Sequence, residues 1–112
     1  MKKVFFASVF LVILVISSNA QIVYPVNNES QADVKVYLVN NERQADLCVY
    51  TVNKDNQTGK NDGKWFFDYY ESQAQKKIYF VDYENKADLK IYFVDYEYQA
   101  GWKNKSKFYI LQ

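Results

Sequence analysis

The chain has no histidine among its 112 residues, and this absence excludes several kinds of site. Histidine is the commonest side chain for acid–base catalysis at neutral pH and the commonest protein ligand for metals. Serine–histidine–acid triads and cysteine–histidine dyads are therefore impossible here. A glycine-rich phosphate-binding loop followed by lysine is also missing. We accordingly expect no catalytic residue, no metal ligand and no cofactor site.

Cysteine is nearly absent as well, because Cys48 is the only one in the sequence. A single cysteine forms no disulfide within one chain. In the repeat described below, Cys48 occupies the position that Lys35 and Lys90 hold in other units. We expect a partly buried thiol, and the alternative is a disulfide between two chains.

Long apolar runs are limited to the start of the chain. Lys2 and Lys3 give a positive N-terminus, the run Val4–Ile16 is apolar, and small residues precede Ala20. This order is typical of a secretory signal peptide, which we predict for residues 1–20. The run is shorter than the roughly 20 residues that a membrane-spanning helix needs.

Cleavage between Ala20 and Gln21 is expected to leave one mature all-β repeat domain, residues 21–112, in the periplasm or outside the cell. Removal of the two signal-peptide lysines leaves 12 basic residues against 13 acidic ones. A nearly neutral surface disfavours nucleic acid as a partner. We expect no membrane span in the mature chain.

The mature chain consists almost entirely of one repeated unit. The clearest copy, residues 87–97, reads Ala-Asp-Leu-Lys-Ile-Tyr-Phe-Val-Asp-Tyr-Glu. In an extended chain Leu89, Ile91 and Phe93 point to one face, and Lys90 and Tyr92 point to the other. β-Branched and aromatic residues favour strands. The unit therefore predicts a strand with one apolar face and one mixed face.

Seven such units follow one another, usually 13 residues apart. Their central aromatic residues are Tyr24, Tyr37, Tyr50, Phe66, Tyr79, Tyr92 and Tyr109. The spacing lengthens after the third and the sixth unit, where the only glycines, Gly59, Gly63 and Gly101, occur. This pattern predicts seven short strands in a chain that goes round in threes, the last strand being Phe108–Leu111.

Units of the form Ala-Asp-x-Lys-x-Tyr-x-Val resemble the 7(1) septoil knot family. The resemblance rests on residues 32–39, 45–52, 77–84 and 87–97. It implies a small, secreted, bacterial all-β domain of uncharacterised function whose backbone forms a knot with seven crossings. Gln75 in the aspartate column departs from the pattern. The alternative architecture is an unknotted β-solenoid or a small barrel of stacked arches.

Carboxylates are the remaining candidates for chemistry. Asp82 with Glu84, and Asp95 with Glu97, could supply the two carboxylates that glycoside hydrolysis requires. Such repeated columns are more typical of solvated bends, so a small carboxylate-based hydrolase is only our second alternative. The segment 55–63 is rich in oxygen ligands, but it lacks the spacing of an EF-hand, and we expect a loop.

The aromatic columns have two interpretations. Central tyrosines stabilise a sheet by packing across neighbouring strands, which is the reading we favour. Trp65 and Trp102 fall in the inserted segments, and tryptophan is enriched at binding hot spots. We therefore predict that Trp65 and Trp102 are the residues most suited to contact a ligand.

The sequence thus predicts a secreted or periplasmic structural or interaction domain without enzymatic activity. The alternative is a glycan- or envelope-ligand-binding module that uses the inserted loops with Trp65 and Trp102. The partner we expect is a protein or a glycan of the cell envelope, and the sequence specifies no oligomeric state.

Overall fold

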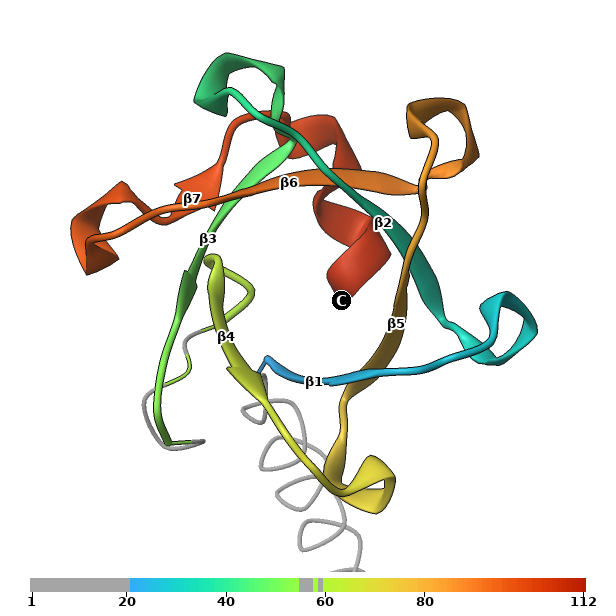
Figure 1. The fold of residues 1–112 in the computed structure, drawn as a ribbon. Coiled ribbons are helices and arrows are strands. Elements are labelled where there is room, and N and C mark those ends of the chain that lie inside the picture. The colour runs from blue at the N-terminus through green and yellow to red at the C-terminus, as the bar shows by residue number, and fades with distance from the viewer. Residues whose placement is uncertain (1–20, 55–57, 59) are drawn as a thin grey trace, which may run out of the picture.

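The computed structural model describes residues 21–54, 58 and 60–112. Within them, seven short strands form one sheet (Figure 1). The strands are β1 (Ile22–Pro25), β2 (Val34–Leu38), β3 (Leu47–Thr51), β4 (Lys64–Phe67), β5 (Lys76–Phe80), β6 (Leu89–Phe93) and β7 (Gly101–Trp102). Strands β1 to β6 each contain the central aromatic residue of their unit, which confirms the predicted all-β repeat.

The last predicted strand, Phe108–Leu111, is wrong. These residues belong to a 3₁₀ helix, η7 (Lys105–Leu111), and the seventh strand is the two-residue β7 instead. The six preceding strands already close the sheet. The segment Phe108–Leu111 adds no strand to this ring, and its apolar residue Leu111 is buried in the core cluster instead.

Strands β1 to β6 are parallel and close into a ring in the order β4-β1-β5-β2-β6-β3, with β3 pairing back to β4. β7 adds to β3 in the antiparallel direction. Consecutive strands within a circuit never pair: β1, β2 and β3 make one circuit, and β4, β5 and β6 fill the gaps in a second circuit. The prediction that the chain goes round in threes is confirmed.

Each strand is staggered between its two neighbours. In β2, Val34 to Val36 pair with the end of β5, and Val36 to Leu38 pair with the start of β6. Because of this stagger, neighbouring strands are tilted relative to one another around the ring (Figure 1). Every connection within a circuit steps past a strand of the other circuit, so the two circuits are interwoven.

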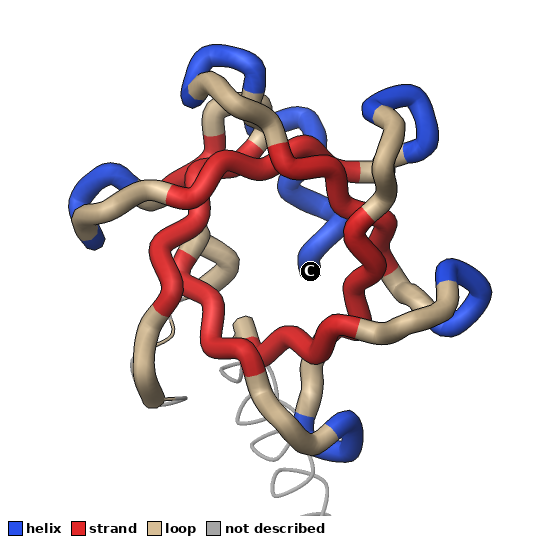
Figure 2. Tube along the Cα trace, in the orientation of Figure 1, coloured by secondary structure: helices blue, strands red, loops and turns tan. Residues whose placement is uncertain are grey.

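Five of the connections project outward from the ring as short turns (Figure 2). We call these connections arms and name them after the 3₁₀ turn in each. The turns are η1 (Glu29–Gln31), η2 (Glu42–Gln44), η4 (Glu71–Gln73), η5 (Glu84–Lys86) and η6 (Glu97–Gln99). Each turn begins at a glutamate and is followed by an alanine whose backbone nitrogen donates to that glutamate's carbonyl oxygen. The short, hydrogen-bonded turns hold the arms in place.

The interior of the ring is filled by the inward face of the strands. In β6, Leu89 and Ile91 are fully buried while Lys90 and Tyr92 are half-buried, as the alternation predicts. The core cluster consists of Val23, Val34, Val36, Leu47, Val49, Trp65, Ile78, Leu89, Ile91 and Leu111. Full burial of one such aliphatic side chain contributes about 1.5–3 kcal/mol. Leu111 belongs to η7, and Figure 1 shows the C-terminus within the outline of the ring.

Across the part of the chain that the structure describes, no helix combines the length and the apolar character needed to cross a membrane.

Candidate functional site

The aspartate of the Ala-Asp pair has a structural role. Asp46 precedes β3, and its Oδ2 accepts a hydrogen bond from the backbone nitrogen of Lys90 in β6 at 2.8 Å. The backbone nitrogen of Asp46 donates to the carbonyl oxygen of Lys90 at 2.7 Å. The same paired contact joins Asp33 to Lys77 and Asp88 to Lys35. These aspartates therefore fix the register where the two circuits meet, which the sequence did not reveal.

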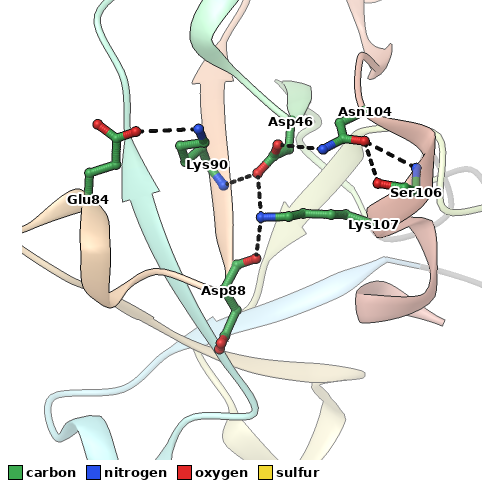
Figure 3. Close-up of polar contacts among 7 residues, drawn as sticks. All are labelled: Asp46, Glu84, Asp88, Lys90, Asn104, Ser106 and Lys107. Atoms are coloured by element: carbon green, nitrogen blue, oxygen red, sulfur yellow. Dashed lines mark hydrogen bonds and ion pairs between the residues drawn. The ribbon is translucent and has the colours of Figure 1, made fainter.

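Unlike Asp33 and Asp88, which are exposed, Asp46 is buried. It also has additional partners (Figure 3). Its Oδ1 accepts from the side-chain nitrogen of Asn104 at 3.2 Å, and the Lys107 ammonium lies 3.4 Å from Oδ2. Its carbonyl oxygen accepts from the backbone nitrogens of Lys103 and Asn104 at 2.8 and 2.9 Å. Asp46 thus anchors the C-terminal segment to the barrel.

The glutamates that open the five arms are all ion-paired with lysines. In three arms the lysine comes from the same unit: Glu29 with Lys35 at 3.6 Å, Glu71 with Lys77 at 3.3 Å and Glu84 with Lys90 at 3.3 Å. The other two pairs are Glu42 with Lys103 at 2.7 Å and Glu97 with Lys64 at 2.9 Å. Because these side chains are substantially exposed, water screens the ion pairs and each contributes little to stability.

The structure separates the two candidate carboxylate pairs. Asp82 and Glu84 lie on arm η5, whereas Asp95 and Glu97 lie on arm η6 at another side of the ring (Figure 1). All four side chains are exposed. Two surface depressions, of about 450 and 270 Å³, receive a carboxylate from Glu84 and from Glu97 respectively. Neither depression combines the two carboxylates that the hydrolase alternative requires.

Cys48 is fully buried, rather than partly buried as we expected. Burial raises the pKa of its thiol, Glu42 raises that pKa further, and Lys103 opposes the rise. In three other units the arm glutamate pairs with the lysine that occupies the repeat position of Cys48. In the unit of Cys48, Glu42 pairs instead with Lys103 of the C-terminal segment. A disulfide between two chains would require this thiol to be exposed.

The prediction that Trp65 contacts a ligand is wrong. Its side chain is 0% exposed and lies in the core cluster, 6.0 Å from the ring of Phe67 between centroids. Trp65 is the second residue of β4 rather than part of the inserted segment. Alternation along the strand therefore turns it inward, as it does Phe67.

Trp102 is half-buried and largely engaged within the protein. Its Nε1 donates to the carbonyl oxygen of Asn61 at 2.9 Å, and its ring lies 5.8 Å from that of Phe108. It also packs against the core cluster. Ligand contact by the exposed part of the Trp102 ring stays a prediction.

The inserted segment 55–63 lies partly outside the described residues, which omit 55–57 and 59. At its end, Asn61 has a φ of 49° and donates from its side chain to the carbonyl oxygen of Phe108 at 3.1 Å. Gly63 has a φ of 93° and packs closely against the carbonyl oxygen of Cys48. The described residues contain no group of three or more acidic or cysteine side chains that could hold a metal ion.

Sequence reasoning missed the most distinctive surface feature, which is a set of exposed tyrosines on the arms of the second circuit. Their side chains are between 60% and 91% exposed. The residues are Tyr69 and Tyr70 on arm η4, Tyr83 on arm η5, and Tyr96 and Tyr98 on arm η6. Such exposure is unusual for a large aromatic side chain, because it leaves apolar area in water.

The two circuits differ at the residue that caps each turn. In the first circuit the caps are Asn28 and Asn41, whose side-chain oxygens accept from the backbone of Ser30 and Arg43. In the second circuit the caps are Tyr70, Tyr83 and Tyr96. Asparagine is a strong capping residue and tyrosine is not. This replacement was the signal in the sequence that pointed to a surface role for the tyrosines.

The two exposed tyrosines of arm η6 lie against each other. The rings of Tyr96 and Tyr98 are stacked, with centroids 5.8 Å apart and planes inclined by 18°. Between them in the chain, Glu97 lines the smaller depression together with Tyr50, Thr51, Val52 and Asn53. A flat aromatic surface therefore adjoins a depression lined by hydroxyl, amide and carboxylate groups.

Comparison with known proteins identifies the family. A family model described as the 7(1) septoil knot domain matches residues 20–103, three quarters of the chain, and ends before η7. No curated protein and no solved structure gives a significant match. The family description specifies a knotted backbone and names no activity. The chain belongs to the 7(1) septoil knot family, as its repeated units predict.

Proposed function

We propose that this domain is a non-enzymatic binding module that acts in the periplasm or outside the cell. Its contact surface is the set of exposed tyrosines on arms η4, η5 and η6. The observation that carries the proposal is that five tyrosines, each at least 60% exposed, lie on arms that project outward from the ring. Tyrosine offers large contact area at a low cost in conformational entropy, which suits it to binding.

The arms are suited to binding because they are preorganised. Each turn is closed by a hydrogen bond from an alanine nitrogen to a glutamate carbonyl, at 3.1 Å in the three arms that bear tyrosine. The glutamate of each is also paired with a lysine. Contact residues held in place before binding lose less freedom when the ligand arrives, so more of the contact energy is retained as affinity.

The three tyrosine-bearing arms alternate with the two asparagine-capped arms around the ring (Figure 1). They therefore form three separate contact points rather than one continuous patch. A polymeric ligand that touches more than one arm would gain avidity without any new contact type.

Arm η6 favours a glycan as the ligand. Aromatic rings pack against the flat C–H faces of sugars, and the depression beside Tyr96 and Tyr98 presents groups that hydrogen-bond to sugar hydroxyls. The sequence carries a net charge of only +1, so no strong field selects a highly charged polymer. A glycan of the cell envelope combines repeated sugar units with a location that an exported protein can reach.

Export is part of the proposal, and it is supported by the signal-peptide pattern of residues 1–20. These residues lie outside the described part of the chain. The mass of the protein recovered from the periplasm or the medium tests the cleavage site. A mature chain that begins at Gln21 is the expected result, and retention of residues 1–20 in the cytoplasm would contradict export.

A binding assay tests the ligand class. The full chain is mixed with insoluble peptidoglycan and with soluble neutral oligosaccharides, and the bound fraction is compared with that of the double variant Tyr96→Ser/Tyr98→Ser. We expect binding to weaken at least tenfold in the variant. Tyr109→Ser is the matched control, because Tyr109 is 68% exposed on η7 rather than on an arm. Equal loss in the control, or no binding to any glycan, would refute the glycan assignment.

A further inference from the structure

Two side chains of the barrel form hydrogen bonds with the backbone of the C-terminal helix η7. Gln21 donates from Nε2 to the carbonyl oxygen of Leu111 at 3.3 Å, and Asn61 donates from Nδ2 to the carbonyl oxygen of Phe108 at 3.1 Å. A 3₁₀ helix has three residues per turn, so the carbonyl groups of Phe108 and Leu111 lie in one row. The two amides therefore bind one edge of a peptide backbone.

The same segment makes an apolar and an ionic contact with the barrel. Leu111 is 1% exposed and belongs to the core cluster. At the other end, the ammonium of Lys107 lies 3.4 Å from Asp46 Oδ2 and donates to the carbonyl oxygen of Asp88 at 3.3 Å (Figure 3). An apolar anchor, a row of carbonyls and a paired cation are the features by which peptides are recognised in clefts.

This end of the barrel has more hydrogen-bonding capacity than η7 uses. Within the described residues, Gln21 Oε1, Asn61 Oδ1 and Trp65 Nε1 are buried without a hydrogen-bond partner. Their residues are at most 6% exposed. An interior built only for packing avoids such atoms, because each unsatisfied polar group is costly. Gln21 and Asn61 therefore each hold η7 through the amide nitrogen and keep an unused acceptor oxygen.

The family match adds an independent observation. The shared domain ends at residue 103, and η7 (Lys105–Leu111) lies wholly beyond it. The six-stranded ring is closed without η7, since no strand of the ring comes from the C-terminal segment. The family match therefore does not extend to this segment, and the strand pairing that closes the ring does not involve it.

We propose that the part of the barrel that holds η7, through Gln21, Asn61 and Asp46, is a peptide-binding site. Its occupant is the chain's own C-terminal segment, residues 103–112, bound in cis. The ligand class is a short 3₁₀-helical peptide with a leucine next to its last residue. The segment leaves the site without unfolding the barrel, and its release opens the site.

Hydrogen exchange on the wild-type full chain tests the independent release. The backbone nitrogens of Asn104 and Lys107 donate to Asp46 and Asn104, whereas those of Val39 and Val81 donate within the barrel. We expect Asn104 and Lys107 to exchange at least 100-fold faster than Val39 and Val81, at rates independent of protein concentration. Exchange of all four at one common rate would show a single cooperative unit and would overturn the proposal.

Binding in trans tests the site directly. In the full-length variant Leu111→Asp the tail is released, and a fluorescent peptide of residues 103–112 is expected to bind it at least tenfold more tightly than it binds the wild-type chain. A peptide carrying Leu111→Asp should not bind, whereas one carrying Tyr109→Ser should bind like the original, because Tyr109 is exposed. Unfolding of the Leu111→Asp chain, or equal binding of all three peptides, would overturn the proposal.

Discussion

The carboxylate of Asp46 accepts a hydrogen bond from the backbone nitrogen of Lys90 at 2.8 Å, across 44 residues of sequence. Asp46 precedes the last strand of the first circuit, and Lys90 lies in the last strand of the second. One side chain therefore links the two interwoven circuits. Because Asp46 also holds Asn104 and Lys107, it links both circuits to the C-terminal segment.

Asp46→Ala is expected to destabilise the protein by about 3 kcal/mol, since buried partners of a charged group are left unsatisfied. Asp33→Ala is the matched control: Asp33 makes the same contact with Lys77 but is exposed. We expect it to cost about 1 kcal/mol. Chemical denaturation measures both variants, and equal losses would contradict the assigned role of Asp46.

Gly63→Ala is expected to destabilise the protein by about 3 kcal/mol or more. An added Cβ would collide with the carbonyl oxygen of Cys48 and lie 2.9 Å from the nitrogen of Gly101, and the φ of 93° is itself unfavourable for alanine. Gly101→Ala is the control. It has a φ of 146° and open space around the new Cβ, so only backbone strain of about 1 kcal/mol or somewhat more is expected. Thermal denaturation compares them, and a greater loss at Gly101 would refute the close contact.

Cys48 is expected to make stability fall at high pH. Burial raises the pKa of its thiol in the folded chain, so the unfolded chain ionises first. The contribution is fully present below the ordinary thiol pKa of about 8.5 and is lost as the pH rises from there through the raised pKa. We expect the free energy of unfolding to drop more between pH 8 and 10 in the wild type than in Cys48→Ala. Identical pH profiles would show that this thiol ionises equally in both states.

Folding is expected to be slow, because five of the six strand pairs of the closed ring join residues that are 44 or 53 apart in sequence. Family membership implies a knotted backbone, which adds the need to pass one chain end through a loop. We expect refolding to take seconds or longer after dilution from denaturant. Refolding within milliseconds in a single phase would argue against a knot.

The repeat predicted the architecture well because one physical pattern recurs in every unit. Period-two alternation placed Leu89 and Ile91 inside and Lys90 outside, and the longer spacings marked the ends of the two circuits. The order in which strands of one circuit pair with strands of the other was not predictable from the sequence. It depends on contacts between distant residues, such as that of Asp46 with Lys90, rather than on the local conformational preferences of the chain.

The site was predicted less well, because exposure depends on what the fold places next to each side chain. Trp65 falls at an inward strand position and is buried, although its neighbourhood in the sequence looks like a loop. Cys48 lies in β3, where the chain returns 53 residues later to pair Gly101 with it. Tyr70, Tyr83 and Tyr96 recur at one position of the repeat, but the sequence does not show that their arms project outward and leave the rings exposed.

The central claim is that the arms of the second circuit are the binding surface. We would test it first by recording NMR spectra of the full chain with ¹³C-labelled tyrosine rings while adding solubilised peptidoglycan fragments. The account predicts shifts for Tyr69, Tyr70, Tyr83, Tyr96 and Tyr98, and none for Tyr109. Fragments that leave the five arm tyrosines unshifted, or that shift Tyr109 equally, would contradict it.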